Sequence, residues 1–277
     1  MGISYDPEHI ARIFDEYADE EWERHERSTM ARVSLHVHLD HLRRFVREED
    51  AVLEVGAGAG RFTVELARLG AHVTVVDISP IQIELNRTRV EEAGMEDHIA
   101  GRAVADMLDL SMFGDASFDA VVCFGGPLSY ALDRADDALD ELLRVTRPGG
   151  LLLVSVMSNL GSVRAFLAGV ADEWDSYGPD NWRAIFESGD LPQDQSSTAP
   201  MHMFRWFELR NLLERRKVEI VTASAANFLS ASTDEVAAAW LHDPERWERF
   251  LAWEVSACAE PGALDGGTHI IAVGRRR

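Results

Sequence analysis

The stretch VLEVGAGAG at residues 52–60 decides the fold of this chain. A short apolar run leads into three alternating glycines, a pattern typical of a strand that turns sharply into a helix. Glycine has no Cβ, so such a turn also lets a ligand approach the backbone closely. Here Arg61 stands where the dinucleotide fingerprint G-x-G-x-x-G has its third glycine. The turn alone therefore leaves open a dinucleotide, a different ligand, or a plain structural role.

Downstream of this turn, short apolar runs alternate with helical patterns, which favours right-handed βαβ units and a parallel sheet. We expect helices at 61–70, 79–94, 131–146 and 206–216, and we interpret RPGG at 147–150 as a turn. The predicted strands are 51–55, 72–77, 99–105, 118–124, 151–157, 218–225 and 269–274.

Composition limits the partners and the compartment. The formal net charge of −21 and the pI of about 4.8 would repel nucleic acid, and no compact basic stripe offsets this charge. The N-terminus has no apolar signal region, and no apolar stretch is long enough to span a bilayer. Two cysteines form no disulfide framework. We therefore expect a cytoplasmic protein with no nucleic-acid or membrane partner.

Three carboxylates sharpen the assignment of the ligand. Glu54 precedes the first glycine, Asp77 ends the second predicted strand, and Asp106 follows the third. In an open α/β sheet the ligand crevice lies at the carboxyl ends of the strands, where Asp77 can accept both ribose hydroxyls of an adenosine. Three acids would repel phosphates, whereas they would attract a ligand with sulfonium and ammonium groups.

These motifs, in their order and spacing, resemble those of class I S-adenosylmethionine-dependent methyltransferases. The resemblance extends more loosely to residues 202–221, although Arg216 and Lys217 stand where the family often has a small residue and glycine. It implies a doubly wound, Rossmann-like, mostly parallel seven-stranded sheet with its last strand antiparallel, plus helical insertions. The segments that carry it are VLEVGAGAG (52–60), HVTVVDISP (72–80), ADML (105–108), FDAVVCFG (118–125) and RPGG (147–150).

On this basis we divide the chain into four parts. Residues 1–48 form an N-terminal helical cover, and 49–158 form the cofactor-binding core. Residues 159–200 form a helical or lid insertion. Residues 201–277 complete the core sheet and contain a second helical insertion at 233–258.

The resemblance also implies a role for individual positions around S-adenosylmethionine. The glycine turn would line the methionine part, and Glu54 would hold its amino group directly or through water. Asp77 would bind the ribose hydroxyls, while Asp106 would accept the adenine amine. Tyr17 or Arg24, on the N-terminal segment, would meet the cofactor carboxylate or simply pack between helices. The remaining implied contacts are Gly56, Ala57, Gly58 and Gly60 in the turn, Ile78 and Met107 on the adenine, and Phe124 and Gly125 near the methyl group.

Two residues are candidates for contact with the methyl acceptor. Tyr130 follows the fourth strand, and His202 precedes the helix before the sixth strand; a packing aromatic and a solvated loop histidine are the alternatives. The motif GGPLSY at 125–130 differs from the Asn/Asp-Pro-Pro-aromatic motif of nucleobase and amide methyltransferases. His36, His38 and His41 do not all share one helix face, so we predict no metal site.

We therefore predict methyl transfer from S-adenosylmethionine to a small-molecule O, N or C nucleophile by in-line displacement, with S-adenosylhomocysteine as product. The alternative is a cofactor-binding relative repurposed as a non-methylating cyclase or regulatory binder; a nicotinamide oxidoreductase fits the acids poorly. The tryptophans of the two helical insertions would wall an apolar acceptor pocket, or close a subdomain or a homodimer face. They are Trp174, Trp182, Trp240, Trp247 and Trp253.

Overall fold

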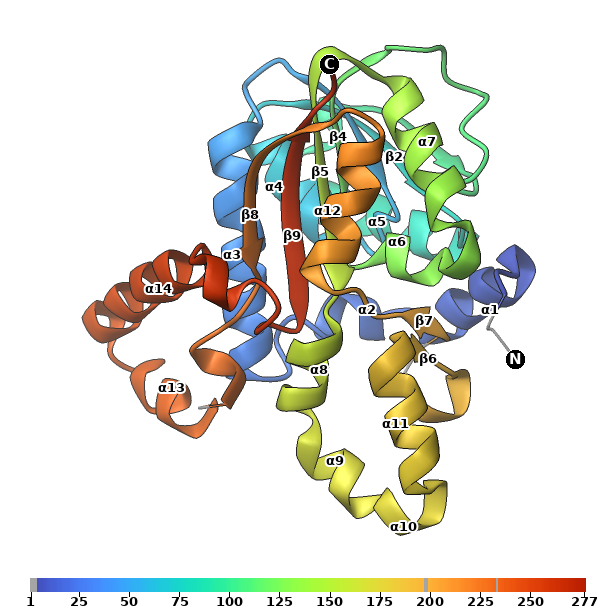
Figure 1. Ribbon diagram of the computed structural model, residues 1–277. Coiled ribbons are helices and arrows are strands. Elements are labelled where there is room, and N and C mark those ends of the chain that lie inside the picture. Colours follow the sequence, from blue (N-terminus) through green and yellow to red (C-terminus); the bar gives the residue numbers. More distant parts are fainter. Residues whose placement is uncertain (1–3, 197–198, 233) are drawn as a thin grey trace.

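The structure is a computed structural model that describes residues 4–196, 199–232 and 234–277. Its centre is a seven-stranded sheet in the order β3-β2-β1-β4-β5-β9-β8, in which β9 runs antiparallel to both of its neighbours (Figure 1). This confirms the predicted fold class. The strands are β1 Ala51–Val55, β2 His72–Asp77, β3 Ile99–Val104, β4 Phe118–Cys123, β5 Thr146–Met157, β8 Glu219–Ala225 and β9 His269–Arg275.

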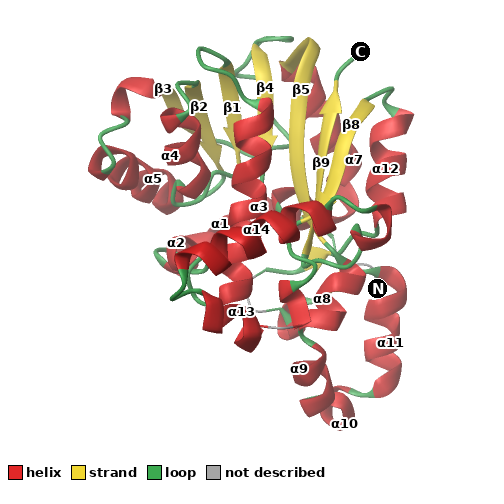
Figure 2. Ribbon diagram, turned by 90° about the vertical axis from the view of Figure 1, so that its left-hand side faces the viewer, coloured by secondary structure: helices red, strands yellow, loops and turns green. Residues whose placement is uncertain are grey.

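Helices cover both faces of the sheet, because most strands are apolar on both sides. Leucines of α6, α7 and α12 build the core on one face, while α3, α4 and α5 cover the other (Figure 2). The bounds of these helices are α3 Thr29–Phe45, α4 Arg61–Arg68, α5 Pro80–Glu92, α6 Pro127–Tyr130, α7 Ala135–Val145 and α12 Trp206–Arg215.

One predicted turn is part of a strand. Residues 147–150 belong to β5, and the pairing register of β5 with β4 shifts between Phe118 and Ala120. Gly149, with φ of 77°, takes the left-handed conformation at this irregularity. The glycines thus allow a bulge inside β5. The chain continues as a strand where we predicted a turn, so that prediction was wrong.

The N-terminal helices are fastened across the carboxyl edge of the sheet. The Gln82 side chain donates to the carbonyls of Phe14 and Ala18, and the Ser79 hydroxyl donates to Asp15 at 2.5 Å. Arg61 lies 3.8 Å from the ring centre of Trp22, a cation–π contact. Arg61, which replaces the third fingerprint glycine, therefore holds the first two helices of the N-terminal segment, α1 Pro7–Tyr17 and α2 Glu20–Glu23, whereas α3 packs on a face of the sheet. These first two helices are called the cover from here on.

The two insertions lie in different places. The first comprises four short helices instead of one continuous helical segment, and it projects beyond the carboxyl edge of the sheet (Figure 1). Residues 197–198 within it, and residue 233 at the start of the second, lie outside the described residues. The elements of the first are α8 Asn159–Ala165, α9 Leu167–Asp172, α10 Trp174–Tyr177, α11 Pro179–Ser188, β6 Asp190–Leu191 and β7 Met201–His202.

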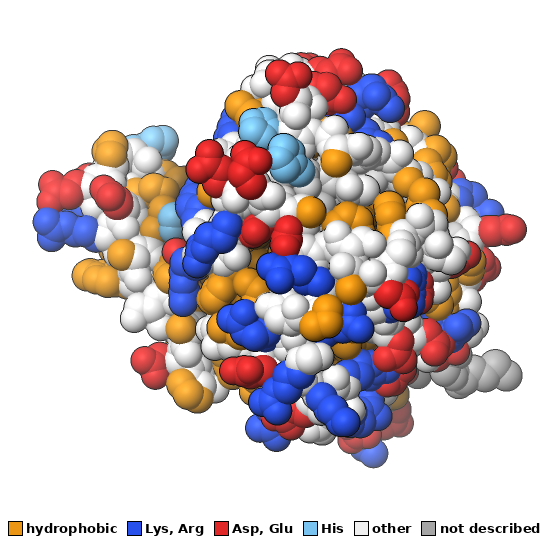
Figure 3. Space-filling model, turned by 90° about the horizontal axis from the view of Figure 1, so that it is seen from above, with side chains coloured by type: hydrophobic (Ala, Val, Ile, Leu, Met, Phe, Trp, Pro, Cys, Tyr) orange, Lys and Arg blue, Asp and Glu red, His pale blue; other side chains and the backbone are white. Residues whose placement is uncertain are grey.

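The second insertion packs on α3 rather than on the first insertion. Its helices are α13 Asp234–Trp240 and α14 Pro244–Cys258, and their tryptophans surround Phe250 beside Val33. Trp240 and Trp247 therefore close a small apolar cluster, while Trp253 is exposed. The opposite edge of the sheet, viewed in Figure 3, carries interspersed acidic and basic side chains rather than one basic patch.

A glycine contact joins the first insertion to the core and yields a stability prediction. A Cβ on Gly161 would lie 1.6 Å from the carbonyl oxygen of Gly267, whereas a Cβ on Gly169 would meet nothing within 4 Å. We expect Gly161→Ala to lower the free energy of unfolding by about 1–3 kcal/mol or more. The matched variant Gly169→Ala replaces a helical glycine where a Cβ meets no other atom, so it should raise the free energy of unfolding by at most about 1 kcal/mol. Urea denaturation of both variants checks this; equal effects would contradict the contact.

Candidate active site

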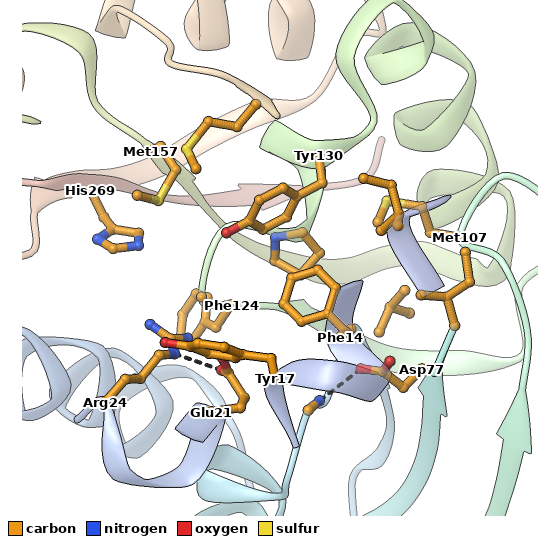
Figure 4. Close-up of a pocket in the computed structure, with 18 of the residues that line it drawn as sticks. Phe14, Tyr17, Glu21, Arg24, Asp77, Met107, Phe124, Tyr130, Met157 and His269 are labelled. Atoms are coloured by element: carbon orange, nitrogen blue, oxygen red, sulfur yellow. Dashed lines mark hydrogen bonds and ion pairs between the residues drawn. The ribbon is translucent and has the colours of Figure 1, made fainter. Parts of the chain in front are cut away.

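A cavity of about 250 Å³ opens at the carboxyl edge of the sheet, beneath α1 and α2 (Figure 4). Asp77 and Met107 lie at one end, while His269 and Met157 lie at the other, with Tyr130 between them. This is the position where ligands bind in open α/β sheets. Eight residues predicted from the sequence line it, namely Tyr17, Gly56, Gly58, Asp77, Ile78, Met107, Phe124 and Gly125, and Tyr130 lines it as well.

The glycine turn is shaped by Asp77 and by crowding. The backbone N–H of Gly58 donates to one oxygen of Asp77 at 2.8 Å, and Ser79 donates to the other at 2.9 Å. Gly56 has φ of 68°, and a Cβ there would lie 2.4 Å from the Pro127 ring. Burial raises the pKa of Asp77 to about 6 despite these hydrogen bonds. The turn therefore requires glycine and carries an acid at its centre.

Glu54 lies under the turn rather than in the cavity. Its side chain is 2% exposed, and one oxygen accepts a hydrogen bond from Thr63 at 2.6 Å. The other oxygen has no partner, and burial raises the pKa of Glu54 to about 8. Glu54 therefore lies outside the lining of the cavity, and its contact with the cofactor amine, direct or through water, stays a prediction. Ala57 and Gly60 also lie outside the lining of the cavity.

The helical cover contributes a charged pair that faces the cavity. Arg24 donates to Glu21 at 2.6 Å, and both side chains line the cavity with Tyr17 (Figure 4). A Cβ on Gly125 would lie 2.7 Å from a terminal nitrogen of Arg24. The absence of a side chain at Gly125 therefore admits the guanidinium. Glu21 was missed by sequence reasoning, since an acid in an acidic helix carries no distinctive signal.

Asp106 is engaged by the N-terminal segment instead of lining the cavity. Its carboxylate accepts from the Tyr5 hydroxyl at 2.8 Å and from the Leu108 N–H at 2.9 Å. Burial and the neighbouring Asp106 charge raise the pKa of Tyr5. Tyr5 itself lines the cavity, so it is a second residue that the sequence did not reveal.

His202 does not reach the cavity. Met201 and His202 form β7, and successive side chains of a strand point to opposite sides. Met201 lines the cavity, whereas His202 faces outward into a separate surface hollow and pairs with Asp190 at 2.8 Å. The prediction that His202 contacts the acceptor is therefore corrected by this alternation.

A different histidine occupies the cavity. His269 begins β9 directly opposite Met157, the last residue of β5, because the two strands are antiparallel. It is 8% exposed, its Nδ1 lies 3.3 Å from the Thr268 hydroxyl, and its Nε2 has no partner. Burial lowers the pKa of His269 well below its usual value, so the ring is neutral at neutral pH. The ring also has a hydrogen bond with the Gly125 backbone, and Nε2 is buried, so this nitrogen would have to face a bound acceptor in order to take its proton.

Comparison with known proteins bears on the core of the chain. Residues 52–150 match a family described as a methyltransferase domain. The ubiquinone biosynthesis O-methyltransferase of Xylella fastidiosa is 34% identical over 135 residues, 48% of this chain and 52% of the relative. The ubiquinone/menaquinone biosynthesis C-methyltransferase of Azotobacter vinelandii is 29% identical over 177 residues, 59% of this chain and 68% of the relative. The chain thus spans about half the length of the first of these relatives.

Solved structures share the fold at low identity. The Burkholderia thailandensis 1,6-didemethyltoxoflavin-N1-methyltransferase, with S-adenosylhomocysteine bound, is 18% identical with a TM-score of 0.53. That match covers 100% of this chain and 92% of the other. The (4+2) cyclase SpnF is 19% identical with a TM-score of 0.55, over 86% of this chain and 79% of the other. No helix among the described residues is long and apolar enough to cross a membrane.

The buried Glu54 predicts a pH dependence of stability. Its pKa rises from a usual value of 4.5 to about 8 on folding, so the folded chain keeps a proton that the unfolded chain has lost. Stability should therefore fall as pH rises from 5 to 8, by up to about 1.4 kcal/mol per pH unit. Glu54→Gln removes this titration, so its stability relative to the wild type should increase over the same range.

Urea denaturation of the two proteins at each pH measures the difference. Glu91→Gln, at an exposed position of α5, is the control and should keep the wild-type slope. Parallel pH profiles for wild type and Glu54→Gln would contradict the assignment.

Proposed function

We propose that the chain is a class I S-adenosylmethionine-dependent methyltransferase that transfers a methyl group from this cofactor to a small-molecule acceptor. The observation that carries the proposal is the cavity itself. It joins an acid and a glycine turn at one end to a buried, neutral His269 at the other. The acceptor would enter at the His269 end, where Tyr130 and Met157 complete the wall.

The residues of the cavity fit the cofactor. Gly56 and Gly58 line the cavity and both have positive φ, so glycine is favoured there and the backbone of the turn lies at the cavity wall, where a ligand can approach it. Asp77 presents a carboxylate to ribose hydroxyls, and Ile78 and Met107 offer apolar surface to adenine. We propose that these residues hold the nucleoside, with Phe124 and Gly125 near the methyl group. Asp106 lies outside the cavity lining and would reach the adenine amine only if Tyr5 released its carboxylate.

The methionine end would meet the charged groups beside the turn. The Arg24 guanidinium would bind the cofactor carboxylate, as a cation facing the cavity can, with Tyr17 packed beside it. Glu54 would act on the amino group through water, and Ala57 and Gly60 would shape the turn. Bound S-adenosylmethionine supplies a methyl group on a positively charged sulfur and leaves as neutral S-adenosylhomocysteine.

His269 is the residue that we propose takes the proton of an O–H or N–H acceptor. In the transfer, the acceptor would form its bond to the methyl carbon as the carbon–sulfur bond of the cofactor breaks, and Nε2 of His269 would take the acceptor proton and pass it on to water. Tyr130, held edge-to-face by Phe14 with ring centres 5.2 Å apart, would orient the acceptor beside it. Orientation and proton removal are the two contributions required of the chain.

Binding of S-adenosylhomocysteine tests the proposal first. At a ligand concentration about 100 times Kd, the chain should gain about 2.7 kcal/mol of stability. Asp77→Asn weakens the acceptor for the ribose hydroxyls, so we expect an affinity about tenfold lower. The exposed Asp97→Asn should leave affinity unchanged. No stabilisation of the wild type by S-adenosylhomocysteine, measured by calorimetric titration and thermal melting, would refute the proposal.

Variants of His269 and His202 test the methyl-transfer step, because His269 lines the cavity and His202 does not. Release of S-adenosylhomocysteine is followed with a panel of phenols, catechols and amines. With an acceptor that turns over, His269→Gln should lower kcat by about 10²–10⁴-fold because the proton acceptor is lost. His202→Gln should leave kcat within about twofold, because that side chain lies outside the cavity. Equal kcat values for both variants would contradict the proposed role of His269. Cofactor binding without turnover of any acceptor in the panel would favour a non-methylating function.

A further inference from the structure

Exposed apolar side chains gather along the first insertion. Phe166 and Leu167 are each 56% exposed, Trp174 is 47% exposed and Phe186 is 41% exposed. All four line one groove between α8, α9, α10 and α11. The other large exposed apolar side chains of the described residues are distributed over separate elements. A concave apolar surface of this kind marks a binding site rather than ordinary surface.

The groove adjoins the cavity of the candidate active site. Met157 and Met201 line both spaces, so the side chains of these two methionines stand between the groove and the wall formed by His269 and Tyr130. The groove encloses about 880 Å³, more than three times the 250 Å³ of the cavity. Its size suits a drug-sized or chain-like molecule, for which pockets of about 300–1,000 Å³ are usual.

The charges of the groove define what it accepts. The acids Glu173, Asp180 and Asp194 line it with one base, Arg183. Arg183 already pairs with Glu187 at 3.3 Å and with Asp180 at 4.0 Å. The groove therefore offers no free cation to a phosphate or carboxylate, and its acidic rim would repel an anionic lipid surface.

We infer that the acceptor carries its nucleophile on an elongated, uncharged apolar body, and that this body lies in the groove of α8–α11 while the nucleophile enters the cavity beside His269. The inference rests on the proposed function and names its substrate class. Adjacency across Met157 and Met201 favours a small molecule over a second protein, because only a narrow ligand can pass two flexible methionine side chains and occupy the groove and the cavity together.

A homologous series of uncharged 4-alkylphenols, from 4-methylphenol to 4-octylphenol, tests the inference by isothermal titration to the chain saturated with S-adenosylhomocysteine. Burial of each added methylene is worth about 0.8 kcal/mol, so Kd should fall about fourfold per methylene until the groove is filled. Phe166→Asp places a carboxylate in the groove and should weaken 4-octylphenol binding by about tenfold or more. Phe166 precedes α9, where Asp is a favourable helix cap, so the variant should fold.

The matched control is Phe207→Asp, because Phe207 is 52% exposed and lies outside the groove. It should bind 4-octylphenol like the wild type, and both variants should bind S-adenosylhomocysteine unchanged. A Kd independent of chain length, or an equal loss in both variants, would overturn the inference while the cofactor result stands. A dimer that Phe166→Asp alone dissociates, seen by sedimentation velocity, would also overturn it, since the groove would then be an interface. Loss of S-adenosylhomocysteine binding in the wild type would instead refute the proposed function.

Discussion

One hydrogen bond, from the backbone of Gly58 to Asp77, fixes the cavity on which the candidate site depends. It ties the turn after β1 to the end of β2, and the N–H groups of Gly56 and Ala57 reinforce it by donating to the carbonyl of Val76. Leaving a buried N–H unpaired costs about 1–3 kcal/mol, so the turn has little freedom to relax. Asp77 therefore supports the shape of the turn and at the same time presents its charge to the cavity.

The antiparallel last strand sets the other end of the site. Because β9 inserts between β5 and β8 against their direction, its first residue lies at the edge where β5 ends. His269 thereby faces a cavity formed mainly by the carboxyl ends of parallel strands. The cavity runs from the glycine turn to His269 and Met157, and the groove of the insertion begins on the other side of Met157 and Met201.

Much of this architecture is predictable from local sequence. The apolar runs are short and bounded by turn residues, so the strands were located correctly, and the acid at the end of β2 marked the cavity. The bulge at Gly149 escaped prediction because glycine and proline signal a turn and a bulge alike. His202 and His269 show the larger limit. The side of a two-residue strand that faces the cavity depends on long-range strand pairing, and so does the residue that lies across an antiparallel pair. A local sequence pattern contains no information about this pairing.

The roles proposed for the cover and for the groove share one physical basis. Both place side chains of irregular or short helical segments over a rigid sheet edge, which is how loops on a scaffold commonly supply specificity. The cover brings charge through Arg24 and Glu21, whereas the insertion brings apolar surface. The charge contributed by the cover suits a zwitterionic cofactor at one end of the site, and the apolar surface of the insertion suits an apolar acceptor at the other end.

The most direct test of this account is a crystal structure of the chain with S-adenosylhomocysteine bound. The account predicts both ribose hydroxyls within hydrogen-bond distance of Asp77, the ligand carboxylate on Arg24, and the sulfur turned toward the end of the cavity that holds His269. A ligand bound elsewhere, or one whose sulfur points away from His269, would contradict it.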